Sequence, residues 1–129
     1  MIRQEFDISY YWRVIVYYNV DYTLFNVIED ELTSANATQS ILKRIYYRMK
    51  SHKAKAVTFS NINLHISIVL FNRHDTFEDY LDSLVHEAEH VKQAMLYAYR
   101  VKDAGEPPAY TVGHIVRRMW RVFKTLLLP

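Results

Sequence analysis

A stripe of apolar residues at helical spacing runs through the second half of the chain, from Phe77 onward. Apolar residues recur there every three or four positions, which predicts an amphipathic helix over about residues 77–101. Asp75 or Thr76 provides an N-cap, and the Asp-Ala-Gly run at 103–105 ends the helix. Such a helix needs a second layer of structure that covers its apolar stripe.

Three segments have the composition of β-strands and are expected to form that layer. Residues 10–20 are rich in β-branched and aromatic residues, residues 56–60 are a short candidate, and residues 64–71 alternate between two faces. Two further helices are expected. One covers about residues 36–50 and begins with a capping box, and the other covers about residues 107–127 and begins with two prolines.

These elements predict an α+β fold in a single domain over residues 1–129. Their order is strand, helix, strand, strand, helix, helix. We expect a short antiparallel or mixed sheet with three helices packed on one side of it. On the strand over 10–20, one face carries a set of large apolar side chains: Trp12, Val14, Val16 and Tyr18.

The composition excludes several kinds of functional site. The chain has no cysteine, which rules out disulfides, cysteine-built zinc or iron–sulfur sites and a cysteine nucleophile. Its two glycines are too few for a P-loop or a dinucleotide-binding fingerprint. The six histidines and the carboxylates therefore remain as candidate metal ligands.

The predicted helix over 77–101 carries an H-E-x-x-H motif, formed by His86, Glu87 and His90. Residues four apart lie one turn apart on the same helix face, so two imidazoles can reach one Zn²⁺ ion. The intervening glutamate can then act as a base toward water. In a shuffled chain with six histidines, the motif would occur about 0.015 times.

Both histidines lie about half a turn from the apolar stripe, on a face shared with polar residues, so they are not expected in the core. Two readings of this face follow. In one, the pair binds a metal ion. In the other, it belongs to an ordinary solvated helix face that also carries acidic residues.

Two segments together resemble the zincin metallopeptidases: residues 86–90 (HEAEH) and residues 105–110 (GEPPAY). They are most similar to the small zincin-like proteins of phages and mobile elements of Bacteroides-type bacteria. Those proteins resemble the gluzincin branch, in which a glutamate on the following helix is the third zinc ligand. The resemblance covers about residues 55–120 and implies a minimal zincin unit: a strand pair, the motif helix and the next helix.

Carried over to this chain, the resemblance implies a zinc-dependent hydrolase, and within that class a metallopeptidase. His86, His90 and Glu106 would bind Zn²⁺, and Glu87 would be the general base. Tyr110, one turn beyond Glu106, would hold a ligand or stabilise an oxyanion. Residues 64–71, the strand before the motif helix, would pair with an extended peptide substrate.

The geometry of the two predicted helices leaves the identity of the third zinc ligand open. If the motif helix runs to Val101, its end lies about 16 Å beyond His90, so Glu106 falls at the far end of the helix pair. His114, on the following antiparallel helix, would lie closer to His90 along the helix axis. A site without a third protein ligand is the remaining alternative. Glu106 has an ordinary structural explanation too, as a carboxylate favoured at a helix N-terminus.

The other histidines and the main charge cluster have structural explanations. His65 is expected to be a sheet residue with a hydrogen-bond partner, and His52 and His74 surface loop residues. Residues 43–55 contain six basic residues and no acidic one, which fits the solvated face of a helix followed by a polar loop. Phosphate contact is the alternative for that segment, but a net charge of +2 is too mild to indicate a nucleic-acid partner.

The N-terminal residues contain no apolar signal core, and the longest apolar run, near residues 66–71, is far too short to span a membrane. We therefore expect a protein of the bacterial cytoplasm or of a phage particle, with no membrane partner. Its expected partner is a peptide or protein substrate. The alternative is a catalytically inactive zincin-like binding or structural protein of a phage or mobile element, with a phage or mobile-element protein as a possible partner.

Overall fold

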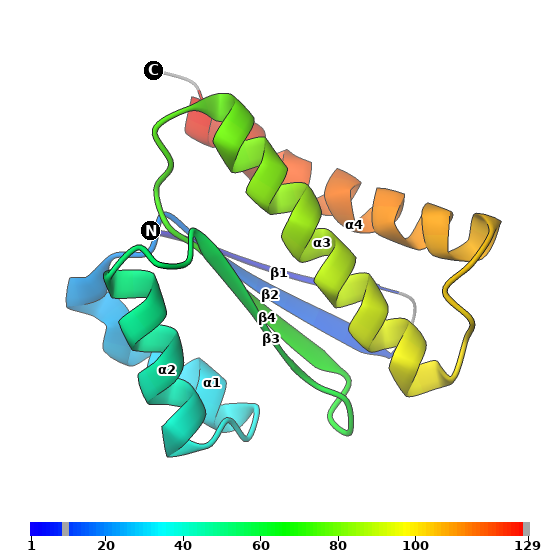
Figure 1. Ribbon diagram of the computed structural model, residues 1–129, viewed down its shortest axis with the longest axis horizontal. Coiled ribbons are helices and arrows are strands. Elements are labelled where there is room, and N and C mark those ends of the chain that lie inside the picture. The colour runs from blue at the N-terminus through cyan, green and yellow to red at the C-terminus, as the bar shows by residue number, and fades with distance from the viewer. Residues whose placement is uncertain (9–10, 128–129) are drawn as a thin grey trace.

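The computed structural model describes residues 1–8 and 11–127 (Figure 1). Within these ranges the chain has an α+β fold with one four-stranded mixed sheet and four α-helices. The strands are β1 (Ile2–Ile8), β2 (Trp12–Tyr18), β3 (Ala56–Asn61) and β4 (Ile66–Phe71). The helices are α1 (Phe25–Ser34), α2 (Gln39–Lys50), α3 (Phe77–Tyr99) and α4 (Glu106–Phe123), with 3-10 turns at Tyr22–Leu24 and Lys124–Leu127.

The sheet has the strand order β1-β2-β4-β3. Two antiparallel pairs, β1 with β2 and β3 with β4, are joined by a parallel pairing of β2 with β4. The two central strands are therefore β2 and β4, and β1 and β3 form the edges. The mixed sheet agrees with the sequence analysis.

Helices cover both faces of the sheet, and not one face as expected. Figure 1 shows α1 and α2 on one side and α3 and α4 on the other. Residues at alternate positions of β2 enter different cores: Val14 and Val16 pack under α3 and α4, and Ile15 packs under α1 and α2. Because residues 14–18 are all buried, this strand has the continuous apolar pattern of a strand covered on both sides.

Two elements were not predicted from the sequence. β1 is an edge strand in which only Phe6 and Ile8 are fully buried, so its apolar pattern is short. α1 has ten residues, and its N-cap Leu24 makes no side-chain capping bond, so the usual start signal is missing. With α1 added, the fold has four helices where three were expected.

Several predicted boundaries were wrong by a few residues. α2 is capped by Thr38, whose side chain accepts a hydrogen bond from the Ile41 N–H, and not by Asn36. β4 begins at Ile66 because His65 has a left-handed backbone conformation with φ 53°. The last α-helix ends at Phe123, before the 3-10 turn. Residue 10, where the first strand was expected to begin, lies outside the described residues.

α3 was predicted correctly, with Thr76 as its N-cap. The Thr76 hydroxyl accepts a hydrogen bond of 3.1 Å from the Asp79 N–H. Its buried stripe lies against the sheet and α4, and each fully buried aliphatic side chain contributes roughly 1.5–3 kcal/mol. The buried members include Leu84, Ala88 and Val91. None of the described helices, α3 included, is long and apolar enough to cross a membrane.

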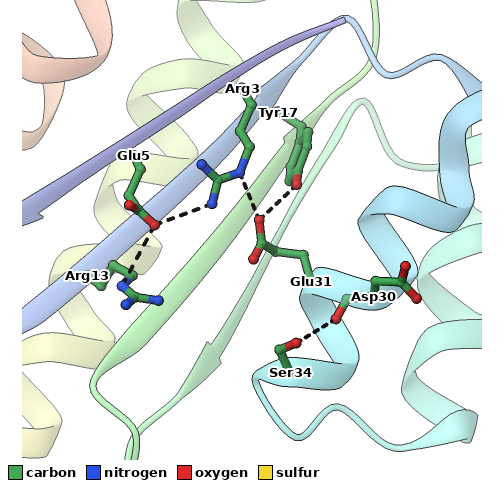
Figure 2. Close-up of polar contacts among 7 residues, drawn as sticks. All are labelled: Arg3, Glu5, Arg13, Tyr17, Asp30, Glu31 and Ser34. Atoms are coloured by element: carbon green, nitrogen blue, oxygen red, sulfur yellow. Dashed lines mark hydrogen bonds and ion pairs between the residues drawn. The ribbon is translucent and has the colours of Figure 1, made fainter.

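A polar network connects β1 and α1, the two elements not predicted from the sequence, to each other and to β2 (Figure 2). The Arg3 side chain of β1 and the Tyr17 hydroxyl of β2 each donate a hydrogen bond of 2.8 Å to Glu31 Oε1 on α1. Arg3 also contacts Glu5, which forms a longer ion pair with Arg13. Glu31 therefore joins α1 to the first two strands.

Candidate metal site

α3 brings the two histidines of the motif into direct contact. The Nε2 atoms of His86 and His90 lie 3.1 Å apart, and both side chains are exposed. Two nitrogen ligands bound tetrahedrally to one zinc ion at about 2.05 Å would lie about 3.3 Å apart. The observed spacing is that of a hydrogen bond between the two imidazoles, and it is also close to the spacing of two ligands of a single metal ion.

Glu87, between the two histidines in sequence, points the other way, into the protein. It is only 5% exposed, and its Oε1 accepts a hydrogen bond of 2.8 Å from the Thr58 hydroxyl on β3. Its second oxygen, Oε2, lies 4.0 Å from His86 Nε2. One carboxylate oxygen is thus held by the sheet, and the other is beside the histidine pair.

Burying a carboxylate is expensive unless hydrogen bonds or a nearby positive charge compensate for lost hydration. Thr58 supplies one neutral hydrogen bond to Glu87. A cation held by His86 and His90 would supply the opposite charge next to Oε2. The donor set, two imidazoles with a neighbouring carboxylate, is chemically suited to zinc.

Thr58 was not identified from the sequence as part of the site. It lies on the strand predicted over 56–60, but no spacing in the sequence connects it to a residue on α3. The same face of the sheet continues as a polar row: Ser60 and Ser67 share a hydrogen bond of 2.7 Å, and Trp12 Nε1 donates to Ser67 at 3.1 Å. A run of Thr and Ser at alternate strand positions is the one signal that would have marked this face.

The structure does not bring a third ligand to the histidine pair. Among the described residues, no group of three or more His, Cys, Asp or Glu side chains could hold a metal ion. α3 ends nine residues after His90, so Glu106, at the start of α4, lies about 14 Å farther along the helix pair. His114 is closer in level but exposed. The ligand role of Glu106 stays a prediction.

The connection before Glu106 is held by Lys92 on α3. The Lys92 ammonium is almost fully buried and forms ion pairs with Glu89 at 2.6 Å and with Asp103 at 2.9 Å. Asp103 belongs to the loop between α3 and α4, so this pair anchors the loop that leads into α4. Figure 1 shows α4 beginning at the end of the pair where α3 ends. Tyr110, one turn into α4, is 73% exposed.

The remaining histidines differ from one another more than expected. His52 is exposed, as predicted. His65 precedes β4 and stacks on Trp12 with ring centroids 5.5 Å apart, so it is not a strand residue. His74 is not a simple surface residue: its Nδ1 donates to the Asn72 carbonyl at 2.7 Å, and its Nε2 lies 2.8 Å from the Ser83 hydroxyl.

Burial lowers the pKa of His74 below its ordinary value. The hydrogen bond to the Asn72 carbonyl opposes this shift, the nearby Lys55 charge reinforces it, and Asp79 and Asp75 oppose it. A neutral imidazole with its proton on Nδ1 satisfies both contacts of the ring. His74 therefore has a structural role at the start of α3, away from the histidine pair.

The edge available to an extended peptide is β3, and not residues 64–71 as expected. β4 pairs with β2 on one side and with β3 on the other, so its backbone groups are already used. β3 has only β4 as a neighbour among the described strands. Since Thr58 on β3 contacts Glu87, this free edge borders the candidate site.

No protein-family model, no curated protein and no solved structure matches the chain.

Proposed function

We propose that the protein is a zinc-dependent hydrolase that acts on peptides, with the site on α3. The observation that carries the proposal is the arrangement of Glu87. Its carboxylate is buried, one oxygen is held by Thr58, and the other is beside two imidazoles whose Nε2 atoms are 3.1 Å apart. An ordinary solvated helix face does not require a buried carboxylate beside its histidines.

In this proposal His86 and His90 hold the ion. A zinc ion bound there would supply Lewis acidity, which activates water and polarises a carbonyl group. Glu87 accepts the proton from the attacking water at Oε2, because Oε1 is occupied by the Thr58 hydroxyl. Thr58 thereby fixes the orientation of the base and leaves a single oxygen for proton transfer.

Glu106 and Tyr110 complete the proposed site. Glu106 is proposed as a ligand, and Tyr110 as an oxyanion or ligand partner, from the zincin resemblance alone. The start of α4 would have to approach His90 for Glu106 to coordinate the same ion. The α+β architecture, with a strand pair, motif helix and following helix, is compatible with a minimal zincin unit.

The proposed substrate is an extended peptide that lies along β3. A peptide strand added to a sheet edge gains main-chain hydrogen bonds without a deep pocket. The edge of β3 lies next to the helix that carries Glu87, since Thr58 on β3 touches that carboxylate. A peptide bound there would run past the histidine pair.

One observation favours a second candidate, a zincin-like protein that binds a partner without catalysis. Catalytic zinc sites usually have three protein ligands, and the described residues gather only two. Such a protein would keep the fold and the peptide-binding edge, and its partner would be a phage or mobile-element protein.

Zinc content and peptide cleavage, measured on the same preparations, test the proposal. The wild type, His86→Ala, Glu87→Gln and the exposed control His52→Ala are purified with zinc present. We expect about one zinc per chain in all but His86→Ala. Cleavage of a peptide library, followed by mass spectrometry, should occur in the wild type and His52→Ala only.

Other results of this experiment would each reject a specific part of the proposal. A wild type that binds far less than one zinc per chain overturns the proposed metal site. A wild type that binds zinc but cleaves nothing overturns the hydrolase and supports the binding protein. Cleavage that survives Glu87→Gln removes the general-base role of Glu87.

A further inference from the structure

The backbone groups that β3 offers to a partner are defined by its register with β4. The Lys55 carbonyl accepts a hydrogen bond of 3.0 Å from the Asn72 N–H, so these two residues form a hydrogen-bonded pair. In an antiparallel ladder such pairs alternate with pairs whose N–H and C=O groups point away. The outward-pointing groups of β3 therefore belong to Ala56, Thr58 and Ser60.

A pocket of about 220 Å³ opens between β3 and α2, on the face of the sheet opposite the histidine pair. Val57 and Phe59 of β3 form its floor and pack in the core under α2. Its other lining residues are Thr58 and a set from α2 at helical spacing: Ile41, Arg44, Ile45 and Arg48. The pocket is apolar at its base and carries two guanidinium groups at its rim.

The charge around this pocket is uncompensated. No acidic residue lines it, and Arg44 and Arg48 form no side-chain ion pair with any described residue. The segment 43–55 contains six basic residues and no acidic one. The three basic side chains at the C-terminal end of this segment have partners elsewhere: Lys50 and Lys53 contact tyrosine hydroxyls, and Lys55 contacts Asp79.

This combination matches an acidic side chain on a peptide strand. A carboxylate accepts bidentate hydrogen bonds from an arginine, and the methylene groups of a glutamate suit the apolar base of the pocket. Side chains of an extended peptide alternate between faces about every 3.4 Å, so every second one would reach the α2 side. Nucleic acid fits less well, since a phosphodiester group can accept from the N–H groups of a strand edge but has no donor for its C=O groups.

We propose that the β3 edge selects peptides with a glutamate or aspartate that enters the Arg44/Arg48 pocket, while the neighbouring positions of the peptide face α3. The inference rests on the proposed function for the reaction carried out at α3, and it adds the substrate class: extended, acidic peptides. On this proposal, the side of β3 that faces α2 selects the peptide by its acidic side chain. The side that faces α3 carries out the hydrolysis.

Binding is tested without turnover in the Glu87→Gln background. Fluorescence anisotropy compares a labelled ten-residue peptide that has glutamate at alternate positions with the same peptide carrying glutamine there. We expect the glutamate peptide to bind at least tenfold more tightly. The double variant Arg44→Gln/Arg48→Gln should reduce that ratio to about one, because the charge-assisted contacts are lost.

A matched control separates the pocket from the general charge of α2. Lys43→Gln/Lys50→Gln also removes two positive charges from α2, but at residues that do not line the pocket. The glutamate peptide should still bind this variant at least about five times more tightly than the glutamine peptide. A third peptide, N-methylated at alternate residues so that it cannot donate to the edge, should bind at least tenfold more weakly than its parent.

Three results would overturn the inference: equal affinity for both peptides, equal losses in the two double variants, or full binding of the N-methylated peptide. Salt-sensitive binding of single-stranded DNA that depends on Arg44 and Arg48, with no peptide selectivity, would assign the pocket to nucleic acid instead. Peptide selectivity in a protein that binds no zinc would leave this inference standing and remove only the proposed hydrolase.

Discussion

The Thr58 hydroxyl on the edge strand β3 donates a hydrogen bond of 2.8 Å to Oε1 of Glu87 on α3. This contact connects the one strand edge that borders the site to the candidate general base. Anything that binds along β3 therefore lies next to the residue that defines the orientation of Glu87. The contact also gives the sheet a direct part in the site, which the H-E-x-x-H motif by itself does not.

Replacing Thr58 with valine should destabilise the fold by about 1–3 kcal/mol, because a buried carboxylate loses its hydrogen-bond donor. Thr58→Ser keeps the hydroxyl and should lose much less. The free energy of unfolding is measured in urea for both variants. In a double-mutant cycle with Glu87→Gln, the two effects should be coupled by at least about 0.5 kcal/mol. Strictly additive effects would contradict the contact.

Zinc titration of Glu106→Gln distinguishes the zincin resemblance from the observed geometry. As a proposed ligand Glu106 should contribute to zinc affinity, so we expect the substitution to raise the dissociation constant for zinc by at least about tenfold. Because Glu106 lies about 14 Å from His90 along the helix pair, the start of α4 would have to shift on metal binding. His90→Ala should weaken binding by at least about a hundredfold. Isothermal titration calorimetry measures all three proteins. A dissociation constant for Glu106→Gln within about threefold of the wild-type value would remove Glu106 from the proposed ligands.

His74 should make the stability of the protein fall in mildly acidic solution. Burial lowers its pKa in the folded chain, so the unfolded chain binds more protons once the pH drops below about 6.5. The stabilisation is complete above that pH and is lost as the pH falls toward the lower pKa of the folded state. Urea unfolding between pH 7.5 and 5 measures the effect.

His74→Gln should show a smaller loss of stability over that pH range, and His52→Gln, at an exposed histidine, should follow the wild type. If His74→Gln and the wild type lose the same stability with falling pH, His74 does not titrate differently in the two states.

Removing the Glu31 carboxylate should destabilise the first half of the fold. Glu31→Ala leaves the Tyr17 hydroxyl and the Arg3 guanidinium without their shared acceptor, which should lower the free energy of unfolding by about 1–3 kcal/mol. Glu29→Ala, at an exposed acid of the same helix, should change it by less than about 0.5 kcal/mol. Equal effects of the two substitutions would mean that the network in Figure 2 adds no stability.

The elements with a complete local signal were predictable. α3 combines a hydroxyl N-cap at Thr76 with an apolar stripe that continues for six turns, so both its existence and its exposed histidine pair followed from spacing alone. β1 and α1 were missed because each offers few buried residues and no strong cap. The second helical layer was missed because only one face of the strand at 12–18 was considered, although Ile15 and Tyr17 on the opposite face are also buried.

The candidate site was predictable in its local part only. His86 and His90 are one helical turn apart, and that spacing is a property of any α-helix. The partner of Glu87 depends on which strand lies under α3, and that strand is fixed by the pairing of β3 with β4 and by the sheet order. No sequence interval encodes the distance between Thr58 and Glu87, so the contact could be found only from the folded chain.

The parallel pairing of β2 with β4 has a consequence for how this chain folds. Each half of the chain contains two helices and an antiparallel hairpin, and the contacts within each hairpin are local and can form early. This pairing places Arg13 opposite Ile66 and Tyr17 opposite Leu70, so its formation must close a loop that contains α1, α2 and β3. We expect this closure to limit the folding rate, and a hydrophobic edge on each preformed half to stay exposed until the two meet.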